Sequence, residues 1–78
     1  MAQKAWLQRI EINPEIMLGK PVIRGTRIPV EIIVRKLAQK ISVEEILRDY
    51  PKLTKRDIQA ALLYAADVLS DEEVLPLA

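Results

Sequence analysis

Hydrophobic residues recur with a helical period through most of the chain after residue 29. From Val30 to Ile41, and again over residues 43–50 and 58–69, they are spaced three and four residues apart, with Pro51 interrupting the pattern. This spacing places them on one face of a helix. It predicts three amphipathic helices. The positions expected to be buried are Val30, Ile33, Val34, Leu37, Ile41, Val43, Ile46, Leu47, Tyr50, Ile58, Ala61, Leu62, Ala65 and Leu69.

Polar residues at the ends of these segments predict where each helix begins. Pro29 suits the first helical position, because the N–H group that it lacks would have no intrahelical acceptor there. Ser42 with Glu45, and Thr54 with Asp57, have the spacing of capping boxes. The connection between the second and third helices is therefore expected to be short.

The residues before the helices follow a different pattern. Residues 6–12 alternate between apolar and polar side chains as in a half-buried strand, and Pro14–Met17 can form one helical turn. Val22-Ile23 and Arg27-Ile28 are β-favouring pairs, and Gly25 between them can adopt the positive φ of a tight turn. We expect a strand and a hairpin in this region.

These elements predict a mainly α fold, a three-helix bundle preceded by short N-terminal β-strands or a hairpin. At 78 residues the chain supports one domain. Residues 1–28 are the expected strand and hairpin region, residues 29–69 the bundle, and residues 70–78 a short tail. A domain of this size buries only about 60% of its unfolded surface, so a second subunit would stabilise it.

The chain contains neither cysteine nor histidine. This removes the usual zinc ligands, thiol nucleophiles and histidine bases, and with them most enzyme classes. We expect no catalytic residue, no metal and no cofactor. No apolar run approaches the roughly 20 residues that span a bilayer, and the N-terminus does not resemble a signal peptide. We therefore expect a cytoplasmic protein without membrane contact.

Charge is distributed unevenly along the chain. Residues 1–41 carry eight Lys and Arg against three Glu, a net charge of +5, and residues 42–78 carry a net charge of −4. Such a chain can present a basic face to phosphates and an acidic face to a basic protein. Alternatively, the two halves neutralise each other in the fold or in a dimer.

The start of the third helix carries the residues best suited to read DNA. Two helices joined by a short turn, with a third before them, are typical of a helix-turn-helix, although bundles that bind no nucleic acid share these connections. Lys55, Arg56 and Gln59 lie off the buried face, where Lys or Arg can donate to guanine and Gln can pair with adenine. Leu63 could contact a thymine methyl group.

The same helix has a second interpretation. Beyond Gln59 it is apolar on nearly every face, which indicates burial on two sides. A second copy of the chain could cover this surface and enlarge a small core. Both roles hold if only the first turn and a half enters the DNA groove. The residues expected at such a dimer or partner surface are Trp6, Leu63, Tyr64 and Val68.

Basic residues outside this helix form another candidate surface. Residues 20–40 alone carry a net charge of +5. They could follow a phosphate backbone, in which case affinity falls steeply with salt, or they could be a solvated face with a few salt bridges. The candidate phosphate contacts are Lys20, Arg24, Arg27, Arg35, Lys36, Lys40, Arg48 and Lys52.

The C-terminal tail, SDEEVLPLA, also has two interpretations. Ser70 and Glu73 have the spacing of a third capping box, which predicts a short turn packed on the bundle until Pro76. Alternatively, the tail is an acidic segment that binds a partner protein.

The segment INPEIMLGKPVIRGTRIPVEIIVRKLAQKISVEEILRDYPKLTKRDIQAALLYAA, residues 12–66, closely resembles the bacterial family called domain of unknown function 433. The hallmark of that family is the run Gly-Lys-Pro-x-Ile-x-Gly-Thr-Arg-Ile-x-Val, followed by Glu-Glu-Ile-Leu, Tyr-Pro-x-Leu-Thr and Ala-Leu-x-Tyr-Ala. The resemblance implies a homeodomain-like helix-turn-helix fold. It also implies an antitoxin that binds a PIN-like ribonuclease toxin and represses their shared operon. The signature residues, which carry no assigned role, are Gly19, Lys20, Pro21, Gly25, Thr26 and Arg27.

These observations predict a dimeric, non-enzymatic, DNA-binding repressor of the antitoxin type. The alternative is a protein-interaction module that neutralises a PIN-like toxin without binding DNA.

Overall fold

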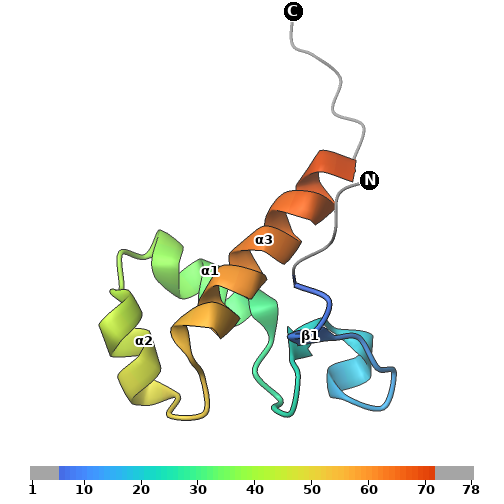
Figure 1. The fold of residues 1–78 in the computed structure, drawn as a ribbon, viewed down its shortest axis with the longest axis horizontal. Helices are drawn as coiled ribbons and strands as arrows, with labels where there is room; N and C mark the ends of the chain where they lie inside the picture. The colour runs from blue at the N-terminus through green and yellow to red at the C-terminus, as the bar shows by residue number, and fades with distance from the viewer. Residues whose placement is uncertain (1–5, 72–78) are drawn as a thin grey trace, which may run out of the picture.

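The computed structural model describes residues 6–71, which fold into three helices preceded by a pair of short strands (Figure 1). The mainly helical class predicted from the sequence is confirmed. In chain order the elements are β1 (Ile10–Glu11), the 3₁₀ turn η1 (Met17–Gly19), β2 (Val22–Ile23), α1 (Val30–Ala38), α2 (Val43–Asp49) and α3 (Lys55–Asp71). None of the helices among these residues is long and apolar enough to cross a membrane.

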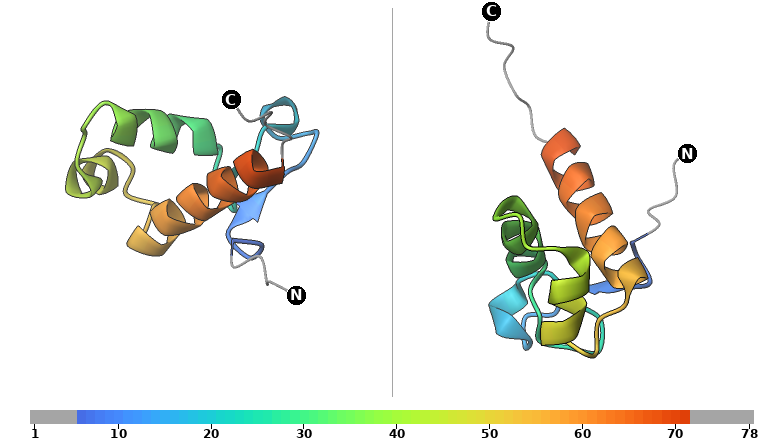
Figure 2. Two further views of the ribbon diagram at one scale, coloured as in Figure 1. Left: turned by 90° about the horizontal axis from the view of Figure 1, so that it is seen from above. Right: turned by 90° about the vertical axis from the view of Figure 1, so that its left-hand side faces the viewer.

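The long helix α3 holds the fold together, because it packs against α1, α2 and β1 (Figures 1 and 2). Its inner face carries the small side chains of Ala60 and Ala61 beside Ile58. The hydrophobic core brings together residues from all of these elements. Its buried members are Ile10, Ile23, Val30, Ile33, Ile46, Leu53, Ile58, Ala60 and Ala61.

The capping residues begin their helices as predicted. The Ser42 hydroxyl accepts a hydrogen bond from the Glu45 N–H group at 3.1 Å. Thr54 and Asp57 form a complete capping box, in which each side chain accepts from the N–H group of the other residue, at 3.2 and 3.0 Å. Ser70 behaves differently, since it lies inside α3 and its hydroxyl donates to the Asp67 carbonyl oxygen at 3.0 Å. The rest of the predicted tail, from residue 72 on, lies outside the described residues.

The predicted strand over residues 6–12 is much shorter in the structure. Residues 6–9 form a turn, because the N–H groups of Arg9 and Ile10 both donate to the Trp6 carbonyl oxygen at 2.9 Å. Only Ile10–Glu11 is a strand, and it pairs antiparallel with β2 in the register Ile10 to Ile23. The turn allows Trp6 to pack beside α3, which an extended chain would not.

The helical turn expected at Pro14–Met17 is also corrected. The chain turns there through an Ile16 N–H bond to the Asn13 carbonyl oxygen and then enters η1, where Met17, Leu18 and Gly19 have φ values of 50°, 58° and 85°. These values belong to the left-handed region. The chain must reverse between two antiparallel strands, and the left-handed residues provide that reversal.

The expected turn around Gly25 is present, with φ of 81° at this glycine. The Ile23 N–H group donates to the Ile28 carbonyl oxygen at 3.0 Å, and Val22 forms an isolated bridge with Pro29. Arg27-Ile28 is not a strand, however. The strand partner of β2 is β1. The loop to α1 contributes only the Ile28 hydrogen bond and the Pro29 bridge, at the other edge of β2.

Two residues of the predicted buried face of α3 are exposed. Leu62 is 44% and Leu69 65% accessible, whereas Ala60, which is not among the predicted buried positions, is 3% accessible. Near its start, the buried face of α3 is formed by Asp57, Ile58, Ala60 and Ala61, and Leu62 lies outside it. For Leu69 the reason is the difference in helix length. At about 1.5 Å per residue, the 17 residues of α3 extend well beyond the nine of α1. The last turns of α3 therefore have less to pack against.

Helix α1 ends three residues earlier than its pattern predicted. Lys40 follows it with φ of 67°, and the Ile41 N–H group donates to the Lys36 carbonyl oxygen at 3.0 Å. This is a Schellman motif, which usually has glycine at the left-handed position. The backbone of Lys40 thus terminates the helix before Ile41, whose side chain still packs against the core.

Candidate nucleic-acid interface

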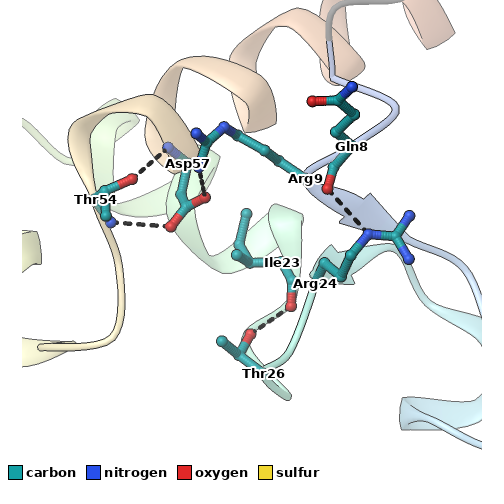
Figure 3. A network of polar contacts seen from close by, with 7 residues as sticks. All are labelled: Gln8, Arg9, Ile23, Arg24, Thr26, Thr54 and Asp57. Carbon is teal, nitrogen blue, oxygen red and sulfur yellow. Dashed lines mark hydrogen bonds and ion pairs between the residues drawn. The ribbon is translucent and has the colours of Figure 1, made fainter.

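The start of α3 is fixed to the N-terminal segment by Asp57 (Figure 3). This residue is only 7% exposed, and its carboxylate accepts from the Thr54 N–H group and from Nη1 of Arg9, both at 3.0 Å. The alternation over residues 6–12 predicts a solvated Arg9 and gives no sign of this ion pair, which joins residues 48 positions apart. The pair sets the orientation of the first turn of α3 relative to the strands.

The predicted base-reading residues Lys55, Arg56 and Gln59 are all exposed on that first turn and a half. None of their side chains makes a hydrogen bond or an ion pair with another described residue. Their donors and acceptors are thus available to a ligand. The only carboxylate within the first turn of α3, Asp57, is turned inward to Arg9.

A groove of about 280 Å³ runs beside this turn, and we call it the α3 groove. The polar side chains along it come from both the helix and the turn over residues 6–9. The sequence pattern gave no sign of Gln8, because its proximity to Gln59 depends on how the N-terminal segment folds back on α3. The residues of the α3 groove are Gln8, Arg9, Arg56, Gln59, Ala60 and Leu63.

A second depression, of about 520 Å³, lies between the β2–α1 turn and the connection from α2 to α3. We call it the turn hollow. It brings together Arg27 and Lys52, two predicted phosphate contacts from separate segments. The residues of the turn hollow are Glu11, Ile16, Gly25, Thr26, Arg27, Ile28 and Lys52.

Arg24 lies apart from these cations, because its guanidinium binds the backbone of the N-terminal segment. Nε donates to the Gln8 carbonyl oxygen at 3.0 Å (Figure 3), and Nη2 donates to those of Leu7 and Ile10 at 3.1 and 3.2 Å. The predicted phosphate contact is therefore held against β1. Its geometry assigns it a structural role in joining the turn of residues 6–9 to β2.

The remaining basic residues differ in their local contacts. Lys20 is paired with Glu31, Nζ to Oε2 at 3.1 Å, and Nζ of Lys36 lies 5.9 Å from the centre of the Tyr50 ring. Lys40 occupies the left-handed position after α1, and Arg48 is exposed in the last turn of α2. Lys20 and Lys36 are therefore engaged within the protein, and the phosphate contacts predicted over residues 20–40 stay a prediction.

An apolar groove of about 400 Å³ lies on the surface between α1 and the C-terminal half of α3. We call it the α1–α3 groove. Lys20 and Arg35 border it, so they do not belong to the surface at the start of α3. The residues of this groove are Lys20, Pro21, Pro29, Val30, Glu31, Val34, Arg35, Tyr64, Ala65, Val68 and Leu69.

Three of the four predicted dimer residues lie together, since Trp6 packs on Tyr64 and Tyr64 lines the α1–α3 groove with Val68, whereas Leu63 lines the α3 groove. Trp6 packs edge-on against Tyr64 with ring centres 4.8 Å apart, and its Nε1 donates to Oδ2 of Asp67 at 2.6 Å. Both aromatic side chains are thus partly covered within the chain. Leu63 and Val68 are each 40% exposed, but they line the α3 groove and the α1–α3 groove respectively.

Comparison with known proteins identifies relatives of this chain. A family model described as "Protein of unknown function (DUF433)" matches residues 10–65. The uncharacterized protein y4eO of Sinorhizobium fredii is 42% identical over 53 residues, which are 68% of this chain and 24% of that protein. An uncharacterized protein of Archaeoglobus fulgidus is 52% identical over 29 residues, 37% of this chain and 81% of the relative. The chain thus spans about a quarter of the length of the first relative and most of the second.

Among solved structures, the chain is similar to a DUF433 member protein from Anabaena variabilis. The crystal structure of that protein matches with a TM-score of 0.75 and 38% sequence identity, over 82% of this chain and 64% of the other.

Proposed function

The chain belongs to the DUF433 family, and from that premise we propose that it is a DNA-binding repressor whose α3 reads the duplex. In this proposal α2, the connection of residues 50–54 and α3 form a helix-turn-helix of the homeodomain-like kind. A recognition helix contacts base edges with side chains near its N-terminus. The observation that carries the proposal is the exposed set Lys55, Arg56 and Gln59, which has no partner within residues 6–71 and lies on a helix start fixed by Asp57.

The chemistry of this set suits the major groove. Arg and Lys donate to guanine, and Gln forms paired hydrogen bonds with adenine. Because Asp57 is buried against Arg9, its charge is compensated within the protein and does not repel phosphates at close range. We further propose that the repressor acts in the cytoplasm as a dimer, which would place two α3 helices on one duplex.

A protein-interaction role is the second candidate, and the α1–α3 groove favours it. This groove is lined mainly by apolar residues, and Val68 and Leu69 are exposed along it. Exposed apolar surfaces of this kind are typical of protein contacts. The family resemblance supplies the partner for this proposal, a PIN-like ribonuclease toxin. Both roles are compatible, since the groove lies beside the opposite half of α3 from Lys55.

Binding to a duplex taken from upstream of the protein's own gene tests the repressor role. We expect the wild-type protein to bind this duplex more tightly than an unrelated one of equal length, with affinity that falls as salt increases. Replacing Lys55 and Arg56 together by Ala should weaken binding at least about tenfold, since each good base contact contributes about 1–3 kcal/mol. Fluorescence anisotropy measures both effects.

Lys20→Ala with Arg35→Ala is the matched control, because it removes two positive charges beside the α1–α3 groove and should leave affinity within about twofold. No binding of either duplex at low salt would contradict the repressor role. So would equal binding by the wild-type protein and the Lys55→Ala, Arg56→Ala variant.

A further inference from the structure

The signature turn of residues 24–27 takes no part in the base-reading surface. Its shape is set by Thr26, whose hydroxyl donates to the Ile23 carbonyl oxygen at 2.7 Å and accepts from the Ile28 N–H group at 3.0 Å. Gly25 has φ of 81°, where a glycine is favoured. The Thr26 side chain is therefore committed to the turn, and any ligand must be bound by other groups.

Two backbone donors of this turn have no acceptor in the part of the chain that the structure describes. The N–H groups of the other four residues from 23 to 28 each donate a hydrogen bond of 2.8–3.0 Å. Those of Gly25 and Arg27 have no acceptor within residues 6–71. A Cβ atom built on Gly25 would meet no atom within 4 Å, so the turn is open at this point. Free N–H groups of a turn are common ligands for anions.

The turn hollow adds two cations to these donors. Arg27 and Lys52 both line it, and neither side chain is bonded to another described residue. Glu11 is the one acidic residue along the described lining, so positive charge exceeds negative charge. Arginine, lysine and backbone N–H groups together are suited to phosphate, whose oxygens accept from all three.

The position of the hollow indicates which phosphate it would meet. Lys52 lies in the connection just before Lys55, the first of the proposed base contacts. In Figure 1 the loop between β2 and α1 and the connection between α2 and α3 both reach the lower edge of the molecule, the end from which α3 starts. If a duplex lies against the first turns of α3, its sugar-phosphate backbone would therefore run past the turn hollow.

We propose that the turn hollow binds one backbone phosphate of DNA, through Arg27, Lys52 and the N–H groups of Gly25 and Arg27. This inference rests on the proposed function for the identity of its ligand. It gives the Gly-Thr-Arg signature a role, since Gly25 and Thr26 shape the turn and Arg27 supplies the charge. A contact of this kind positions the protein on the duplex without reading sequence.

Inorganic phosphate is the probe that tests the hollow directly. In ¹⁵N–¹H correlation spectra of the whole chain, phosphate added against chloride at equal ionic strength should shift the amide signals of Gly25 and Arg27 saturably. Lys52→Ala should weaken this response several-fold, and Glu11→Gln should strengthen it. Lys20→Ala, the charge-matched control, should not change it. Absence of a saturable shift, or an unchanged response in Lys52→Ala, overturns the inference.

Binding of DNA separates the hollow from the base-reading surface. Lys52→Ala and Arg27→Ala should each weaken binding of the upstream and the unrelated duplex by a similar factor, and should lower the slope of log affinity against log salt by about one. If the wild-type protein binds DNA and these variants keep its affinity and slope, the inference fails and the repressor role stands. If the wild-type protein binds no duplex, the repressor role fails, and the assignment of the hollow to DNA fails with it.

Discussion

Asp57 connects the helix cap, the N-terminal segment and the candidate DNA surface. Its carboxylate completes the capping box of α3 with one oxygen and holds Arg9 with the other. A buried acceptor with two donors is expensive to lose, because removal leaves the donors unsatisfied. The contribution of the ion pair itself is smaller, since the Arg9 side chain is 37% exposed and solvent screens it.

Asp57→Ala should therefore lower the free energy of unfolding by about 1–3 kcal/mol. Arg9→Ala should lower it by less than about 1 kcal/mol. Urea unfolding followed by circular dichroism measures both values. Asp49→Ala, which removes an exposed carboxylate from the last residue of α2, is the control and should cost nothing. Equal losses in the Asp57 and Asp49 variants would contradict this role of the cap.

The residues at the helix starts favour the backbone geometry found there, but the residue that follows the end of α1 does not. Ser42 and the Thr54 and Asp57 pair are residues expected at helix starts, and the structure uses them so. At the end of α1, by contrast, a lysine occupies the left-handed position of a Schellman motif. A side chain in that conformation costs about 1–2 kcal/mol, which glycine avoids.

Lys40→Gly should accordingly raise the free energy of unfolding by about 1 kcal/mol, because it relieves this strain while keeping the motif. Gln39→Gly is the matched control, since Gln39 has φ of −84° and gains nothing from glycine. Thermal or urea unfolding compares the two variants. A less stable Lys40→Gly protein would show that the lysine side chain contributes more than its backbone strain costs.

In the molecule as a whole, polar and apolar surfaces lie at different ends of α3. Gln59 and Arg56 border the α3 groove, whereas Val68 and Leu69 border the α1–α3 groove. A small domain with exposed Leu62, Leu63, Val68 and Leu69 gains stability by covering them. Self-association and DNA binding can thus use separate surfaces of one helix.

Leu69→Gln tests this separation. Because Leu69 is 65% exposed, the substitution should change the free energy of unfolding by less than about 0.5 kcal/mol. It should weaken self-association in sedimentation experiments while leaving a folded chain. Leu53→Gln, in the core, is the contrasting variant and should destabilise the fold itself. Unchanged self-association in Leu69→Gln would place the dimer contact elsewhere.

Local sequence signals predicted the three helices, their caps and the turn at Gly25, because periodicity, capping and positive φ each depend on residues close along the chain. They also placed Lys55, Arg56 and Gln59 on an exposed face. Contacts between distant segments could not be predicted in this way. The bond from Arg9 to Asp57, the retention of Arg24 by the N-terminal backbone, and the proximity of Arg27 to Lys52 all arise when β1, the signature turn and α3 pack together. A one-dimensional pattern shows which residues are available, and packing determines which of them meet.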